Sequence, residues 1–394
     1  MTAPRRERSI ERTTTYPGGG SVALLVHTCD VHLGAPLGWL GEAAGEQRRQ
    51  LRETFASIVD LALDRRADCL IVAGDLFDST SPPASDVRFA ISELTRYASG
   101  SGGTAVVLPG SHDHLGTGTV FESYRQEFSR AERLVVLGLE ERDSVELTHR
   151  GLAVHGRPLT TNASSERPLA NLKPSPGIPI NVAVAHGSVE IVPGASSDHP
   201  MSTAELDAGW SYVALGHWHS WKEVTSSAVY AGSPEIVAPD QEGAGSVALV
   251  HFADHDPRVE RVPVARRAVR KAEIEIGDGD AAALAGRIRG IVPPSDDTIL
   301  ELTLEGLIDA DAGFDESVLL ELLSDEYFHV SVPERAFHVR LDEESLSRLP
   351  SEMVVGRFAR LMRSRIEKAD DPEERAELED ALQLGVSLLQ GREL

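Results

Sequence analysis

Five short clusters of aspartate and histidine, each at the end of an apolar run, constrain this chain more than any other sequence feature. In chain order they read Asp30-Val31-His32, Gly74-Asp75-Leu76-Phe77-Asp78, Gly110-Ser111-His112-Asp113, His186-Gly187 and Gly216-His217-Trp218-His219. Because α/β sheets bind ligands outside the carboxyl ends of their strands, we expect the clusters to meet at one edge of the fold. Carboxylate and imidazole ligate divalent metals, so the series predicts a metal site.

The spacing within the clusters indicates how two cations could be shared. Residues two apart on an extended segment project to the same side, so Asp30 and His32 can bind one cation, and His217 and His219 also point together. Asp75 follows a glycine at a strand end and is the natural bridging carboxylate between two cations about 3.5–4 Å apart. Each pair alone occurs often by chance, but their order and strand-end positions together predict a two-metal site.

The length of the chain indicates how many domains it forms, and its net charge indicates which ligands it can bind unaided. A chain of 394 residues predicts two or three domains. The formal net charge of -24 argues against autonomous binding of nucleic acid, since such binding neutralises phosphates with Lys and Arg. Bound divalent cations can reverse the sign of a local site, however, so the charge does not exclude DNA as a substrate.

The sequence predicts a cytoplasmic protein without a membrane segment. No apolar run approaches the about 20 residues that span a bilayer, and residues 1–20 lack the apolar region of a secretory signal. The only cysteines, Cys29 and Cys69, adjoin apolar runs, so a disulfide framework is not expected.

The hydrophobic pattern predicts four parts. After a flexible tail over residues 1–20, residues 21–264 alternate strand and helix and then continue as many short strands, which indicates an α/β fold with two packed sheets flanked by helices. Residues 265–345 predict a small α+β unit that includes two short strands at 328–332 and 337–341. Residues 346–394 predict two acidic amphipathic helices, whose apolar stripe serves either as core packing or as a docking face for a partner helix.

The motifs resemble the calcineurin-like metallophosphoesterase superfamily. Within it, His27-Thr28-Cys29-Asp30-Val31-His32-Leu33-Gly34 and Tyr212-Val213-Ala214-Leu215-Gly216-His217-Trp218-His219 resemble the bacterial SbcD-type DNA repair exonucleases, and Tyr230-Ala231-Gly232-Ser233-Pro234-Glu235 also matches that branch. The resemblance implies a two-sheet sandwich flanked by helices, a capping domain over residues 265–345 and a C-terminal helical segment that docks on an SMC-like ATPase.

The resemblance also implies a role for each site residue. One metal would be held by Asp30, His32, Asp75 and His219, and the second by Asp75, His186, His217 and Ser111. His112 would lie beside the scissile phosphate as a proton donor or charge stabiliser, with Asp113 orienting its ring. Mixed carboxylate and imidazole ligation favours two Mn²⁺ ions, with iron, zinc and cobalt as alternatives.

One position departs from the family pattern, which is Gly-Asn-His-Asp where this chain has Gly110-Ser111-His112-Asp113. A neutral serine is a shorter and weaker ligand than the amide carbonyl of asparagine, so we expect a looser second metal site rather than an inactive enzyme.

The function implied is a metal-dependent DNA exonuclease or endonuclease that acts in break repair with an SbcC-type ATPase, as a homodimer. Two alternatives remain open. One is another phosphodiesterase or phosphomonoesterase on the same scaffold, although Asp75 is not followed by the Val-Asp-Arg-Gly continuation of protein phosphatases. The other is a catalytically weak scaffold that binds an ATPase through its C-terminal helices.

Overall fold

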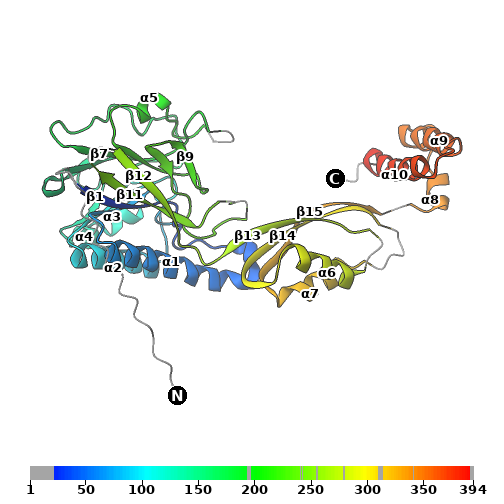
Figure 1. Ribbon diagram of the computed structural model, residues 1–394, viewed down its shortest axis with the longest axis horizontal. Coiled ribbons are helices and arrows are strands. Elements are labelled where there is room, and N and C mark those ends of the chain that lie inside the picture. The colour runs from blue at the N-terminus through cyan, green and yellow to red at the C-terminus, as the bar shows by residue number, and fades with distance from the viewer. Residues whose placement is uncertain are drawn as a thin grey trace, which may run out of the picture.

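The structure is a computed structural model that describes residues 22–192, 197–239, 241, 243–253, 256–277, 280–308, 314–339 and 341–390. The tail expected over residues 1–20 lies outside the described residues. The fold places a compact unit of two sheets at one end, a three-stranded sheet beyond it and a helical segment farther along the long axis (Figure 1).

The first sheet has six strands and carries three of the five clusters. Its order is β12-β11-β1-β2-β3-β4, with β1 to β4 parallel and β11 and β12 antiparallel. Continuous apolar sequence explains why the parallel strands are buried on both faces. The strands are β1 (Val22–Thr28), β2 (Cys69–Ala73), β3 (Thr104–Leu108), β4 (Leu134–Val136), β11 (Ser246–Ala253) and β12 (Asp256–Pro263).

The second sheet also has six strands and carries the other two clusters. Its order is β5-β6-β7-β8-β10-β9, with β6, β7, β8 and β10 parallel. The strands are β5 (Ser144–Leu147), β6 (Leu152–His155), β7 (Ile180–His186), β8 (Tyr212–Gly216), β9 (Lys222–Thr225) and β10 (Ala228–Tyr230).

Three apolar layers hold this unit together. Between the sheets, residues such as Leu25 and Ile71 pack against Val182 and Val184. Helices α1 (Ala44–Asp64) and α2 (Ala84–Gly100) cover the outer face of the first sheet (Figure 1). The outer face of the second sheet packs under loops and the short helix α5 (Thr203–Leu206). The remaining short helices are η1 (Gly38–Ala43), α3 (Val120–Ser123), α4 (Arg125–Phe128) and η2 (Thr148–Arg150).

A three-stranded parallel sheet follows, formed by β13 (Ala268–Glu275), β14 (Ser295–Ile308) and β15 (Tyr327–Val339), with β14 in the centre. Helices α6 (Ala281–Ile291) and α7 (Glu316–Ser324) pack on it. The prediction of two separate strands at 328–332 and 337–341 was wrong. Because β15 is an edge strand, it tolerates Pro333 at an irregularity in its pairing with β14 and continues as one strand.

The C-terminal helices are α8 (Glu343–Ser347), α9 (Val354–Ile366) and α10 (Pro372–Leu389). Asp371 caps α10 by accepting a hydrogen bond from the N–H of Glu373, and Pro372 starts it. The apolar stripes of α9 and α10 pack against each other, which agrees with the core-packing alternative. Other apolar side chains stay exposed: Met353, Val354, Leu361, Leu384, Leu388 and Leu389.

The predicted fold class is confirmed: two sheets flanked by helices, a small α+β unit and C-terminal helices. The proposed domain limits at residues 264/265 and 345/346 stay a prediction. No helix among the described residues is both long and apolar enough to cross a bilayer.

Candidate metal centre

The five clusters meet where parallel strands of both sheets end. Asp30 follows β1, Asp75 follows β2, and Ser111 follows β3, while His186 ends β7 and His219 lies just beyond β8. Backbone hydrogen bonds hold the loops together: the N–H of Asp30 donates to Gly74 O at 3.1 Å, and that of His32 donates to Asp75 O at 3.0 Å.

Four site residues adopt left-handed backbone conformations. The φ angles are 50° at Asp30, 51° at His32, 52° at Asp75 and 102° at His217. A side chain in this region costs about 1–3 kcal/mol, and such strain concentrates at functional sites. The expectation that Asp30 and His32 lie on an extended segment was therefore wrong, although the turned backbone still brings both side chains to one site.

The first donor group is formed by Asp30, His32 and His219, whose ligand atoms lie within 4.8 Å of one another. His32 Nε2 is 3.2 Å from His219 Nε2, and His219 Nε2 is 3.8 Å from Asp30 Oδ1. Asp75 Oδ2 is 3.9 Å from His32 Nε2, which places this carboxylate between the first group and the second.

The second donor group centres on Asp75 and His186. Asp75 Oδ2 is 3.2 Å from His186 Nε2, and Asp30 completes a group of three within 4.8 Å. Ser111, which is buried, donates from Oγ to Asp75 Oδ2 at 3.1 Å and lies 3.3 Å from His186 Nε2. The serine that replaces the family asparagine therefore lies among the donors of the second group.

His217 is placed differently from the other expected ligands. Its backbone N–H donates to both carboxylate oxygens of Asp30 at 3.1 Å, and its ring packs against that of His186 at 5.3 Å between centroids. Among the described residues, no group of three donor atoms within 4.8 Å includes His217.

His112 and Asp113 lie at the site but not in the relationship that was expected. His112 is exposed, and its Nδ1–H donates to the backbone oxygen of Asp78 at 3.0 Å. Asp113 is buried and accepts hydrogen bonds from Gly110 N at 2.7 Å and Phe77 N at 3.1 Å. Asp113 therefore fixes the two loops, and Asp78, rather than Asp113, orients the His112 ring.

Two contributing residues are absent from the predicted ligand set. Asp78 Oδ1 accepts from His32 Nδ1 at 3.1 Å, which orients that imidazole, and a carboxylate in this position is typical around metal-binding histidines. Asp78 could have been identified from the sequence, because it belongs to the same cluster as Asp75. Gln241 contacts His219 Nδ1 through its side-chain nitrogen, and no local sequence pattern marks this residue.

The charges at the site fit a bound divalent cation. Burial would raise the pKa of Asp75, but the facing His186 and His32 hold it well below its usual range. Burial would lower the pKa of His186, but Asp75 raises it to about 9. Burial lowers the pKa of His219 to about 4, which keeps its imidazole neutral and able to ligate. Two buried carboxylates surrounded by imidazoles form a donor set suited to divalent metals.

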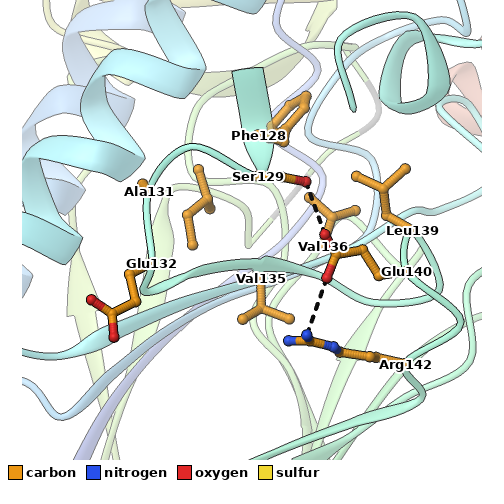
Figure 2. Close-up of a pocket in the computed structure, with 10 residues that line it drawn as sticks. Phe128, Ser129, Ala131, Glu132, Val135, Val136, Leu139, Glu140 and Arg142 are labelled. Carbon is orange, nitrogen blue, oxygen red and sulfur yellow. Dashed lines mark hydrogen bonds and ion pairs between the residues drawn. The ribbon is translucent and has the colours of Figure 1, made fainter. Parts of the chain in front are cut away.

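A separate cavity of about 260 Å³ opens beside β4 and α4 (Figure 2). At its rim, Glu140 accepts from Ser129 at 3.2 Å and pairs with Arg142 at 3.2 Å, while Phe128 and Leu139 give it apolar walls. None of the metal-centre residues lines this cavity, so it is not part of the site.

Comparisons with known proteins agree with this geometry. The family model of the calcineurin-like phosphoesterases matches residues 24–221, just over half of the chain. A DNA double-strand break repair protein Mre11 from Aeropyrum pernix is 28% identical over 287 residues, which cover 65% of this chain and 64% of that protein.

Two Bacillus subtilis proteins are similar as well. The uncharacterized metallophosphoesterase YhaO is 25% identical and covers 59% of this chain and 58% of its own. The SbcD component of the nuclease SbcCD is 24% identical and covers 57% of this chain and 65% of its own. The chain spans less than two thirds of the length of these three relatives. Since the family model matches just over half of the sequence and the donor groups lie within that match, this chain belongs to the calcineurin-like phosphoesterase family.

Proposed function

We propose that this protein is a two-metal DNA nuclease that hydrolyses phosphodiester bonds in break repair. The observation that carries the proposal is the convergence of Asp30, His32, Asp75, His186 and His219 into two adjoining donor groups, with the exposed His112 beside them. The names of the relatives, which include break repair and nuclease proteins, favour DNA over other phosphodiesters.

The residues fit the two metals as follows. Asp30, His32 and His219 would hold one ion, and Asp75, His186 and Ser111 the other, with Asp75 shared and His217 as a further candidate ligand beside His186. Manganese suits this mixture of carboxylate and imidazole. Bound ions of this kind supply the positive charge that polarises the phosphodiester and activates the attacking water.

His112 is the proposed proton donor. Its Nδ1–H is engaged by the backbone oxygen of Asp78, which leaves Nε2 as the ring atom for proton transfer. The ring packs edge-on against that of His32 at 4.8 Å, so a phosphate held by the first donor group would lie within its reach. A proton given to the leaving oxygen stabilises that oxygen as the bond breaks.

Replacing His112 with alanine is expected to slow manganese-dependent cleavage of a DNA oligonucleotide by about 10²- to 10⁴-fold. Turnover of bis(p-nitrophenyl) phosphate should fall much less, because its leaving group needs little protonation. Steady-state rates on both substrates check this, with the exposed His149→Ala as a matched control. An equal loss on both substrates would contradict proton donation by His112. Turnover of small diesters without cleavage of any DNA would contradict the nuclease proposal itself.

The proposed partner is an SMC-like ATPase that binds the C-terminal helices. The apolar stripes of α9 and α10 pack against each other and are not available to a partner. The surface available for docking is therefore the group of exposed apolar side chains that includes Leu361, Leu384 and Leu388. We also propose that the protein forms a homodimer and that it is located in the cytoplasm.

A further inference from the structure

A second cavity, of about 440 Å³, is lined by residues of the loop 236–244, by β12 and by the beginning of β13 with the connection before it. Four cationic residues line it: Arg261 on β12, Arg267 in the connection, and Arg270 and Lys271 on β13. None of the described residues that line it is acidic. Positive charge gathers at this cavity although the chain as a whole has a formal net charge of -24.

The four cations differ in how far their charges are already compensated. Arg267 is buried, pairs with Glu46, donates to Gln47 Oε1 at 2.8 Å and stacks on Phe328 at 3.5 Å, so its charge is structural. Exposed Lys271 pairs with Glu301 at 3.7 Å. Neither Arg261 nor Arg270 has a carboxylate partner among the described residues.

The hydrogen bonds of Arg261 and Arg270 run to neutral groups. Arg261 donates to Ser246 Oγ at 2.9 Å and Gly243 O at 2.6 Å, and lies over the ring of Trp221 at 5.5 Å. Arg270 donates to the backbone oxygen of Val269 at 3.3 Å. Both guanidinium groups keep donors available for an anion, because each carries five N–H groups.

The buried residue Gln241 links the lining of the cavity to the metal centre. Gln241 lines the cavity and contacts His219 Nδ1 with its side-chain nitrogen, while its Oε1 accepts from Val237 N at 3.0 Å. One residue thus separates the cavity from a member of the first donor group. A polymer held at the metals could therefore place a neighbouring charged group in the cavity.

We infer that this cavity binds a backbone phosphate of the DNA strand, next to the phosphate held at the metals. The guanidinium groups of Arg261 and Arg270, which have no carboxylate partner among the described residues, match the charge and geometry of a phosphodiester. The site combines residues of the two-sheet unit with residues of β13, so it is complete only when both are in place. The inference rests on the proposed nuclease function and adds a second contact with the same strand.

The test compares full-length variants loaded with manganese. Arg270→Gln/Lys271→Gln removes two charges from the cavity, and Arg88→Gln/Arg258→Gln removes two exposed charges elsewhere as the matched control. The probes are a 12-nucleotide single-stranded oligonucleotide and bis(p-nitrophenyl) phosphate, which has no neighbouring phosphate. Arg270→Gln alone serves as a milder variant that leaves the Lys271–Glu301 pair intact.

The double cavity variant is expected to raise the KM for the oligonucleotide by about tenfold. The slope of the logarithm of oligonucleotide affinity against the logarithm of salt concentration should fall by about the amount of one phosphate contact. Turnover of the small diester should not change, and the control should match the wild type on both probes. Equal oligonucleotide KM values for the cavity variants and the control would overturn the inference while leaving the nuclease proposal intact. A wild type that cleaves only the small diester would overturn both.

Discussion

Replacing Asp75 with asparagine is expected to lower manganese-dependent turnover of DNA and of small diesters alike, by at least about 10²- to 10³-fold. Asp75 faces both donor groups, at 3.9 Å from His32 Nε2 and 3.2 Å from His186 Nε2. Asparagine keeps the size of the side chain but removes the charge that both groups share. We therefore expect a folded protein that binds less manganese.

The carboxylate of Asp75 also organises the neighbouring loop. Its Oδ1 accepts from His112 N at 2.9 Å and its Oδ2 accepts from Ser111 Oγ at 3.1 Å. An asparagine can accept only one of these bonds through its carbonyl oxygen, so the loop that carries His112 should loosen as well. Both losses act on turnover in the same direction.

Asp86→Asn is the matched control for this change. Asp86 on α2 is also a buried carboxylate, but it pairs at 2.7 Å with Arg52 on α1, outside the metal centre. Steady-state rates, manganese stoichiometry and circular dichroism of both variants are the measurements. A folded Asp75→Asn protein with the activity of Asp86→Asn would contradict the assignment of Asp75 as the shared ligand.

Replacing Gly74 with alanine is expected to lower the free energy of unfolding by about 2–5 kcal/mol. Gly74 has φ of 91°, a conformation that costs any other L-residue about 1–2 kcal/mol. A Cβ there would lie 2.0 Å from His186 Nδ1 and 2.5 Å from its Cγ, so the imidazole would have to move. That ring is held by its bond to Ala73 O at 3.0 Å, which explains why the loss should extend to activity.

Gly286→Ala provides the contrast within the same chain. Gly286 is exposed on α6, and its added Cβ would meet nothing within 4 Å, so alanine should raise stability by about 0.5–1 kcal/mol through helix propensity. Urea denaturation of the two variants gives both values. A Gly74→Ala protein as stable as the wild type would contradict the close packing of His186 against this turn.

The sequence could predict that the clusters meet because the pattern that indicates it is local. Each cluster follows a short apolar run, and such runs become buried parallel strands whose ends meet at one edge. Asp30, Asp75 and His186 could therefore be assigned to one site without knowledge of the tertiary structure. The left-handed backbone conformations of Asp30 and His32 could not be predicted from the sequence, because non-glycine residues adopt them only where the surrounding packing enforces them.

The remaining differences arise from long-range contacts. Gln241 contacts His219 through a loop that no periodicity describes, and the orientation of His112 by Asp78 rather than Asp113 depends on how two loops pack. In the same way, Pro333 indicates a break in a strand, but an edge position with irregular pairing lets β15 continue through it.

The proposed nuclease requires that this chain hold two metals at the meeting point of its two sheets. Crystals grown with manganese, measured at its absorption edge, test this most directly through anomalous scattering. We expect two peaks, one within ligand reach of Asp30, His32 and His219 and the other within reach of Asp75, His186 and Ser111. A single peak, or peaks away from these residues, would contradict the two-metal assignment.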